Sequence, residues 1–325
     1  MENKEDHYKG KFLADDKNIR LDLYLFNYFD FFSRTKIKNH ILNGNILINK
    51  NKTSPSYILK GNEKIDYDFS VSTKPNSIEP EDINFDIIYE DEYLAVINKP
   101  TGLVVHPGSG ISNGTLANAL AFRFNNLSKL NNQAPGIVHR LDKETSGIML
   151  IAKKDEVHAN LSKQFESRMI NKVYRSIVWG NMPDSGLING LISRDRKNRT
   201  IFSLQSKGRD SETSFKKINH FAPLSYVELY PKTGRTHQIR VHLKSISNPI
   251  ICDESYGGGI SKIKSYHIKY ANILKMILNS IDRVALHAYS IEFTHPQTNQ
   301  KNKFFAPIPD DFEYILNILK KGSND

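Results

Sequence analysis

A polar segment with two prolines, residues 70–80, divides this 325-residue chain into a small part and a large one. The segment reads SVSTKPNSIEP, and prolines and serines at this density favour an extended connection over the interior of a helix or strand. We therefore expect two folded units joined by a linker. The small unit would span residues 19–69 and the large one residues 81–312, with tails at residues 1–18 and 313–325.

Cysteine and apolar content exclude several classes of protein. Cys252 is the only cysteine, which excludes an intramolecular disulfide and any cysteine-rich zinc or iron–sulfur site. The longest purely apolar run is the five residues from Ile148 to Ala152, whereas a membrane-spanning helix needs roughly 20. The first twelve residues mix charges and lack the apolar stretch of a secretory signal. We expect a cytoplasmic protein that does not enter a membrane.

Basic residues outnumber acidic ones, 45 to 35, for a formal net charge of +10. Residues 11–60 hold nine basic and four acidic residues, residues 193–217 hold eight and three, and residues 79–92 hold seven acids with no lysine or arginine. Such segregation is typical of a protein with one basic face. The charge favours a polyanion as partner, although a solvated surface without a partner would show the same counts.

The small unit has the pattern of two short helices followed by two strands. Apolar residues recur at a spacing of four from Leu21 to Phe29, and a second periodic run ends at Gly44, where glycine commonly ends a helix. Residues 45–50 and 64–69 alternate apolar and polar side chains, as half-buried strands do.

The order of these features resembles the S4 RNA-binding domain. The resemblance rests on R-L-D, then S-R-T, then I-L-N-G-N-I-L-I-N, all within residues 20–49. It implies a small α/β appendage whose second helix meets the RNA backbone through Arg34 and Lys38. The alternative is a helical hairpin packed against the rest of the protein, with both side chains solvated.

The large unit mixes strands and helices without regular alternation. Strand-like segments outnumber helical ones, which favours an α+β fold with a mixed, largely antiparallel sheet over a doubly wound one. The strand-like segments are residues 85–100, 147–152, 172–179 and 225–230, and the helical ones are residues 115–122, 156–165, 236–246 and 266–281.

Nucleotide-binding loops and metal-ligand spacings are both missing from the sequence. The glycines that follow Val105 are spaced G-x-G-x-x-x-G, one residue too long for a dinucleotide loop, and no Walker sequence occurs. His237 and His242 are five residues apart, which does not place both imidazoles on one helix face. We expect neither a cofactor nor a metal.

Two polar clusters are candidates for a functional site. Asp142 follows apolar residues and directly precedes a strand, a position at the rim of a sheet where function is common; a turn-forming or capping aspartate is the alternative. Arg240 lies beside the apolar face of an expected helix, and a partly buried guanidinium needs an anionic partner. An aspartate paired with it would stay ionised, or the arginine would only hold the helix in place.

Four strings resemble the successive motifs of the RluA/RluD-type pseudouridine synthases. The VVHPG and YGGG strings, together with the S4-like unit, are most similar to the D type, which acts on large-subunit ribosomal RNA. The resemblance implies an RNA pseudouridine synthase of mixed α+β fold with ribosomal RNA as partner, and we expect a monomer. Residues 258–282, rich in lysine, depart from the motifs as an insert. The four strings are NKPTGLVVHPG from Asn98, HRLDKETSG from His139, NKVYRSIVWG from Asn171 and TGRTHQIRVHL from Thr233.

The resemblance implies catalytic roles for three residues. Asp142 of the HRLD string would be the essential catalytic aspartate, Tyr174 would lie against the target base, and Arg240 would pair with the aspartate. The carboxylate would attack ribose C1′ or remove the proton from C2′, and both routes stay open. Neither route requires a redox change, a phosphate or a metal.

Four further residues would bind the substrate. Arg140 would enter the RNA helix as the target uridine turns out, Leu286 would line the base pocket, and Arg235 and His237 would contact the substrate. The alternatives are a related synthase acting on tRNA or another ribosomal site, and a non-catalytic RNA-binding ribosome-assembly factor. A metal-free glycosidase is a third, for which Glu144 is the only nearby second acid.

Overall fold

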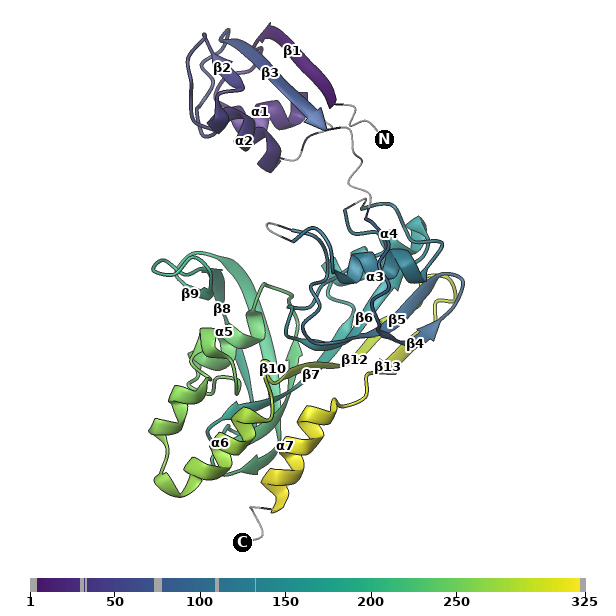
Figure 1. Ribbon diagram of the computed structural model, residues 1–325, viewed down its shortest axis with the longest axis vertical. Coiled ribbons are helices and arrows are strands. Elements are labelled where there is room, and N and C mark those ends of the chain that lie inside the picture. The colour runs from purple at the N-terminus through teal and green to yellow at the C-terminus, as the bar shows by residue number, and fades with distance from the viewer. Residues whose placement is uncertain are drawn as a thin grey trace. The chain divides into compact units, whose positions relative to one another are not determined.

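The chain forms two compact units, Met1–Ser77 and Ile78–Asp325 (Figure 1). The boundary falls within the expected linker, residues 70–80. Its start is wrong, because residues 70–72 continue a strand of the small unit. Residues 73–77 lie outside the described residues, so the rest of the linker stays a prediction. The structure is a computed structural model that describes residues 5–29, 32, 34–72, 78–108, 111–131 and 133–321.

The small unit packs two helices against an antiparallel sheet with the strand order β1-β3-β2. Leu21, Leu25, Ile37 and Ile41 are fully buried in its core, so the apolar periodicity that predicted both helices also holds them in place. The two expected strands are β2 and β3. The elements are α1 (Leu21–Tyr28), α2 (Arg34–Asn43), β1 (Glu5–Leu13), β2 (Ile46–Ile48) and β3 (Lys64–Ser72).

The tail expected at residues 1–18 is wrong, because residues 5–13 form β1. This strand pairs with β3 along its whole length, with Phe12 opposite Ile65. The Phe12 ring stacks on Tyr28 of α1, with ring centroids 4.0 Å apart. Tyr8 and Phe12 pack against the core of the unit, and the charged residues between them concealed the strand in the sequence.

The large unit is built on a ten-stranded sheet (Figure 1). The strand order is β4-β5-β6-β12-β7-β11-β10-β8-β9, with β13 paired to β12. Among the described residues the pairings are antiparallel except that of β6 with β12, which confirms the mixed, largely antiparallel α+β fold. The strands are β4 (Asp86–Glu90), β5 (Leu94–Lys99), β6 (Ser146–Ala152), β7 (Asn171–Trp179), β8 (Ser185–Arg194), β9 (Phe202–Gln205), β10 (Arg209–Phe221), β11 (Leu224–Pro231), β12 (Leu286–Thr294) and β13 (Lys301–Phe305).

The helices of the large unit pack into two apolar clusters. One cluster joins α3 and α4 to β5 and β6, and the other joins α5, α6 and α7 to β7 and β11. Within the described residues, no helix is long and apolar enough to cross a membrane. The helices are α3 (Leu116–Arg123), α4 (Asp155–Glu166), α5 (Gln238–Ser245), α6 (Ala271–Asn279) and α7 (Asp310–Lys321), with short 3-10 helices η1 (Glu254–Tyr256), η2 (Ile260–Ser265) and η3 (Ile268–Tyr270).

Helix α7 occupies most of residues 313–325, so the expected C-terminal tail is also wrong. Phe312 and Leu319 lie on one face of the helix and are buried in the core. Arg283 donates two hydrogen bonds, of 2.6 and 2.8 Å, to the Asp311 carboxylate and fastens the start of the helix. Apolar residues at helical spacing between an acidic start and a lysine-rich end are the signal that the tail assignment overlooked.

The lysine-rich insert, residues 258–282, is part of the core. Helix α6 begins at Ala271, later than the predicted helix over residues 266–281, because two 3-10 turns precede it. Leu274 and Ile277 of α6 are buried in the same cluster as β7 and β11.

Strand β6 enters the middle of the sheet directly after the loop that holds Asp142. Gly147 on this strand has a φ of +114°, and a Cβ there would collide with the backbone of Ala288 on β12. Only glycine permits this close approach of the two parallel strands. The parallel pairing therefore holds the Asp142 loop at the centre of the sheet.

Candidate active site

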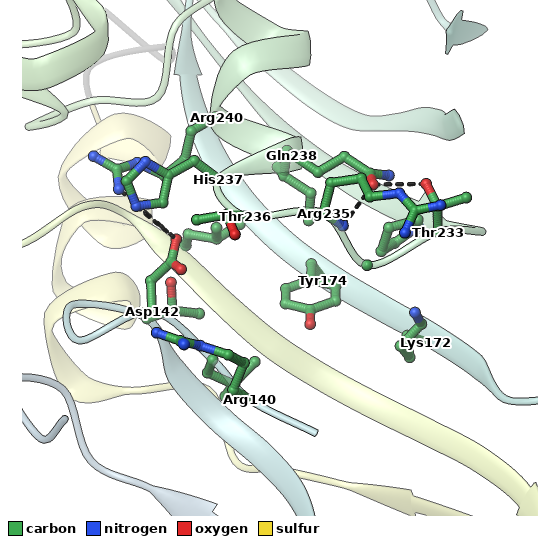
Figure 2. Close-up of a pocket in the computed structure, with 16 residues that line it drawn as sticks. Arg140, Asp142, Lys172, Tyr174, Thr233, Arg235, Thr236, His237, Gln238 and Arg240 are labelled. Carbon is green, nitrogen blue, oxygen red and sulfur yellow. Dashed lines mark hydrogen bonds and ion pairs between the residues drawn. The ribbon is translucent and has the colours of Figure 1, made fainter. Parts of the chain in front are cut away.

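One pocket collects every site residue that the sequence predicted in the large unit. Its walls are the loop before β6, strand β7, the first residue of β12, and the turn that leads into α5 (Figure 2). Arg34 and Lys38 belong to the small unit and do not line it. The predicted residues that do are Arg140, Asp142, Tyr174, Arg235, His237, Arg240 and Leu286.

Asp142 presents its carboxylate to two cationic or donor groups. Its Oδ2 lies 3.7 Å from Nη1 of Arg240 and 4.0 Å from Nε2 of His237. The backbone carbonyl of Asp142 accepts the Thr145 N–H at 3.1 Å, which closes the turn before β6. The side chain is 24% exposed, so a substrate can reach the carboxylate.

Arg240 has a second and tighter acidic partner that the sequence did not predict. Its Nε and Nη2 donate to the Asp253 carboxylate at 2.7 and 2.8 Å, and Asp253 is 1% exposed. Burial works to lower the pKa of Arg240, but the hydrogen bonds to Asp253, together with the negative charges of Asp253 and Asp142, outweigh burial and raise that pKa. The prediction that Arg240 pairs with Asp142 is therefore incomplete: the direct hydrogen bonds go to Asp253, and Asp142 receives the outer ion pair.

Tyr174 and Leu286 form the apolar part of the pocket. They come from the neighbouring strands β7 and β12, where Tyr174 pairs with Ala288. Burial raises the pKa of Tyr174, so its side chain stays a neutral phenol in the wall of the pocket. Lys172, two residues before Tyr174, also lines the pocket, and burial lowers its pKa to about 8.

The turn before α5 is held by the side chain of Gln238. Its Oε1 accepts the Thr233 hydroxyl at 2.6 Å and the Arg235 backbone N–H at 3.0 Å. Its Nε2 donates to the Glu212 carbonyl at 2.9 Å. This network presents Arg235 and His237 to the pocket. Gln238 stands within the GRTHQIR string, but only the fold shows what it contacts.

His237 and His242 have unrelated surroundings. His237 has a φ of +54° just before α5, and its Nδ1 lies 2.9 Å from the Tyr256 hydroxyl. His242 is fully buried, with Nε2 2.8 Å from the Ser211 hydroxyl. In the part of the chain that the structure describes, no three His, Cys, Asp or Glu side chains are placed to hold a metal ion.

Lys99 supports the loop that carries Asp142. This lysine of the NKP string is fully buried, and its ammonium donates to the carbonyls of Leu103 at 2.9 Å and Lys143 at 3.2 Å. Burial lowers the pKa of Lys99 to about 7, although Asp142 favours its charged form. The contact joins the first motif string to the second.

The basic residues predicted in the small unit gather around one buried acid. Asp22 is fully buried and lies 2.9 Å from Nε of Arg20, 2.9 Å from Nη2 of Arg34 and 3.7 Å from Nζ of Lys38. Each of the three basic side chains is 41% exposed. Arg34 and Lys38 thus lie on the same face of α2, and both form ion pairs with Asp22.

Comparison with known proteins identifies the family. The family model described as RNA pseudouridylate synthase matches residues 93–245, which hold Asp142, Tyr174 and Arg240. A protein of Buchnera aphidicola called ribosomal large subunit pseudouridine synthase D is 40% identical over 303 residues, covering 93% of this chain and 94% of its own length. A protein of the same description from Xanthomonas campestris is 34% identical over 304 residues, covering 94% and 90%.

Solved structures agree with this fold. Human RNA Pseudouridylate Synthase Domain Containing 4 has a TM-score of 0.53 and 25% identity, over 72% of this chain and 93% of that one. Human RNA Pseudouridylate Synthase Domain Containing 1 has a TM-score of 0.53 with 23% identity, over 73% and 87%. The chain belongs to the RNA pseudouridylate synthase family. It is an isomerase whose substrate is uridine in RNA.

Proposed function

We propose that this enzyme converts uridines of large-subunit ribosomal RNA to pseudouridine, with Asp142 as the catalytic carboxylate. The observation that carries the proposal is the pocket itself, in which Asp142 is the only acid among the lining residues that the structure describes. Its Oδ2 lies 3.7 Å from Arg240. Relatives described as ribosomal large subunit pseudouridine synthase D support ribosomal RNA as the substrate.

The reaction needs one acid that acts on the ribose. Asp142 attacks C1′ and is released when C5 later bonds to that carbon, or it removes the proton from C2′ and later returns it. In either route the bond between C1′ and N1 breaks. The base then turns, C5 bonds to C1′, the C5 proton leaves to solvent, and N1 gains a proton. No atom is lost or gained overall, which is consistent with a site built from a carboxylate and its cationic neighbours.

The uridine must leave its stack to reach Asp142, which costs a few kcal/mol. Stacking of the flipped base on Tyr174 returns about 1–3 kcal/mol. Arg140 is exposed at the mouth of the pocket, two residues before Asp142. We expect its guanidinium to occupy the gap that the uridine leaves, and Leu286 to close the apolar side of the base.

A basic groove beside the pocket supports an RNA strand running past Asp142. Five of its lining residues are cationic and one is acidic, Glu166. Arg168, in the groove, has a φ of +59° directly after α4, where glycine or asparagine is usual. An arginine at this position costs backbone strain, and a contact of its guanidinium with an RNA phosphate would explain why it is there. The cations are Arg140, Arg168, Lys172, Lys232 and Arg235.

The S4-like unit would add a second contact with RNA. Three basic side chains against the single carboxylate of Asp22 leave a net positive face on α2. We assign Arg34 and Lys38 to the RNA backbone, with Asp22 fixing their direction. The enzyme would act on RNA in the cytoplasm and as a monomer; both stay predictions.

Tritium release tests the proposal. Ribosomal RNA transcribed with [5-³H]uridine should lose tritium to water when the full-length enzyme is added. Asp142→Asn should lower the rate by about 10³-fold or more while leaving RNA binding nearly unchanged. Glu144→Gln, which removes the exposed acid of the same loop, should retain activity.

The experiment tests the catalytic acid, the substrate and the activity separately. Turnover by Asp142→Asn near the wild-type rate would show that another acid is catalytic. Release from tRNA but not from ribosomal RNA would replace the substrate and keep the activity. Binding of RNA without tritium release from any cellular RNA would favour the assembly-factor alternative.

A further inference from the structure

Tyr256 lies at a junction directly behind the active site. Its side chain is 1% exposed. Its hydroxyl accepts the Phe202 backbone N–H at 3.0 Å and lies 2.9 Å from Nδ1 of His237. The centre of its ring lies 4.8 Å from the Arg240 guanidinium. One buried phenol therefore contacts the β8–β9 hairpin and both residues that face Asp142.

Either the Tyr256 hydroxyl or Nδ1 of His237 could donate the hydrogen bond between them, and the other contacts of the hydroxyl decide which one does. The phenol has one hydrogen, and its oxygen already accepts the Phe202 N–H. If Nδ1 of His237 also donated to this oxygen, the buried phenol hydrogen would have no acceptor within the described residues, at a cost of about 1–3 kcal/mol. The phenol therefore donates to Nδ1. A neutral imidazole with Nδ1 unprotonated carries its hydrogen on Nε2, and burial lowers the pKa of His237, which favours the neutral ring.

The Nε2–H group faces the catalytic carboxylate. Nε2 lies 4.0 Å from Oδ2 of Asp142, and Nη1 of Arg240 lies 3.7 Å from the same oxygen (Figure 2). At these distances neither contact is a direct hydrogen bond. The oxygen is surrounded by donors yet remains free to act on the ribose.

We propose that Tyr256 is a positioning residue of the active site. Its hydroxyl holds His237 as the Nε2–H tautomer, so that an N–H group, and not a lone pair, faces Asp142. In the other tautomer, the lone pair on Nε2 would face Asp142 and repel its ionised carboxylate. The inference rests on Asp142 being the catalytic group, as proposed above.

The same hydroxyl anchors the basic hairpin. Phe202 is the first residue of β9, and its ring meets His237 edge-on, with ring centroids 5.7 Å apart. Arg194, the last residue of β8, lies over the Phe202 ring at 5.4 Å. Tyr256→Phe should thus have two separable effects: loss of the tautomer lowers kcat, and loss of the hairpin anchor raises KM for RNA.

The tautomer can be measured in the wild-type protein without any variant. The full-length enzyme is labelled with ¹⁵N-histidine, and the long-range nitrogen–proton spectrum distinguishes a protonated from an unprotonated Nδ1. His237→Gln identifies the His237 signals. We expect an unprotonated Nδ1 in the wild type and a mixture of tautomers in Tyr256→Phe. A protonated Nδ1 in the wild type overturns the proposal, and this readout does not depend on the proposed substrate.

Kinetics with tritiated ribosomal RNA provide the second test. Tyr256→Phe keeps the ring under Arg240 and should lower kcat about 10–100-fold. In His237→Gln, the amide N–H replaces Nε2–H and has no tautomer to lose. In that background Tyr256→Phe should lower kcat by less than about threefold, a coupling measured by the double-mutant cycle.

Tyr266→Phe is the matched control. Tyr266 is a half-buried tyrosine of the same region, stacked on Trp179 with ring centroids 5.2 Å apart. Its substitution should leave kcat, KM and the His237 tautomer unchanged. An equal loss of kcat by Tyr256→Phe in both His237 backgrounds would show that Tyr256 acts on folding or on the hairpin alone, and would overturn the proposal.

Discussion

Asp253 determines the surroundings of Arg240, although it lies thirteen residues further along the chain. Its buried carboxylate takes two direct hydrogen bonds from the guanidinium, and one guanidinium nitrogen is left facing Asp142. Arg240 is thereby held beside Asp142, with its Nη1 3.7 Å from Oδ2 of that carboxylate. Asp253 directly precedes η1, and Tyr256, the partner of His237, is the last residue of η1. One short element therefore orients both neighbours of Asp142.

Removal of the Asp253 charge should therefore damage both folding and catalysis. Asp253→Asn leaves Arg240 buried without a direct counter-ion, and we expect a loss of about 3–5 kcal/mol in the free energy of unfolding. Urea unfolding measures it. Asp184→Asn, which removes an acid whose side chain is 95% exposed in its ion pair with Lys217, should cost less than about 1 kcal/mol. Equal effects of the two substitutions would refute the assignment.

Buried histidines should make the protein less stable in mild acid. Burial lowers the pKa of His242 to about 4, whereas an unfolded histidine titrates near 6.5. Between these values the unfolded state binds more protons, so His242 contributes stability that is complete above pH 6.5 and is lost as pH falls toward 4. From pH 7.5 to pH 5 the loss is about 2 kcal/mol.

His242→Gln tests this pH dependence. Glutamine does not titrate, and its amide can replace the contact of Nε2 with Ser211. Urea unfolding at pH 7.5 and pH 5 should show a stability difference smaller by about 2 kcal/mol than in the wild type. The same substitution at the exposed His267 is the control. An unchanged difference in His242→Gln would mean that His242 does not carry the effect.

At the scale of elements, the sequence predicted a helix or strand where apolar residues recur at regular spacing. Strand β6 and helix α4 were predicted nearly to their ends. Strand β10 was missed, because RDSETSFKKINHF has few apolar residues. It is a strand because β8 and β11 pair with it on either side, which no local pattern reports.

Helix α7 should prove essential to the core rather than a dispensable end. Phe312→Ala removes a fully buried ring and should destabilise the protein by about 3–5 kcal/mol in urea unfolding. Tyr314→Ala, two residues along and 52% exposed, should change stability by about 0.5 kcal/mol or less. A small effect of Phe312→Ala would support the original expectation of a tail.

For the whole molecule, the net charge of +10 predicts strongly salt-dependent binding. If RNA makes about 6–10 phosphate contacts, affinity should fall about 10³–10⁵-fold between 50 and 200 mM salt. The structure shows basic residues gathered in the groove beside Asp142, on the β8–β9 hairpin, and around Asp22 in the small unit. Substitutions in each of the three measure their contributions to binding one at a time.

The cations of the groove should contribute a measurable part of the slope of log Kd against log salt. Arg168→Asn suits the positive φ at that position, and together with Lys232→Gln it removes two cations. We expect the slope of log Kd against log salt to fall by about 1.4–1.8, measured by filter binding of ribosomal RNA. Lys301→Gln with Lys320→Gln, two exposed lysines outside the groove, is the matched control. An equal change in both pairs would mean that net charge, not the groove, governs binding.

The sequence by itself determined the family, the mixed α+β fold and seven of the residues that line the pocket, because motif strings and apolar periodicity are local properties of a chain. Tertiary structure alone decided which side chains those residues contact. Arg240 contacts Asp253, His237 contacts Tyr256, and Lys99 supports the Asp142 loop. The residues of each pair lie on different turns or strands, and nothing in their sequence positions shows that they meet. Hydrogen-bond partners depend on where the backbone passes in space, and that follows from how the whole sheet and its helices pack.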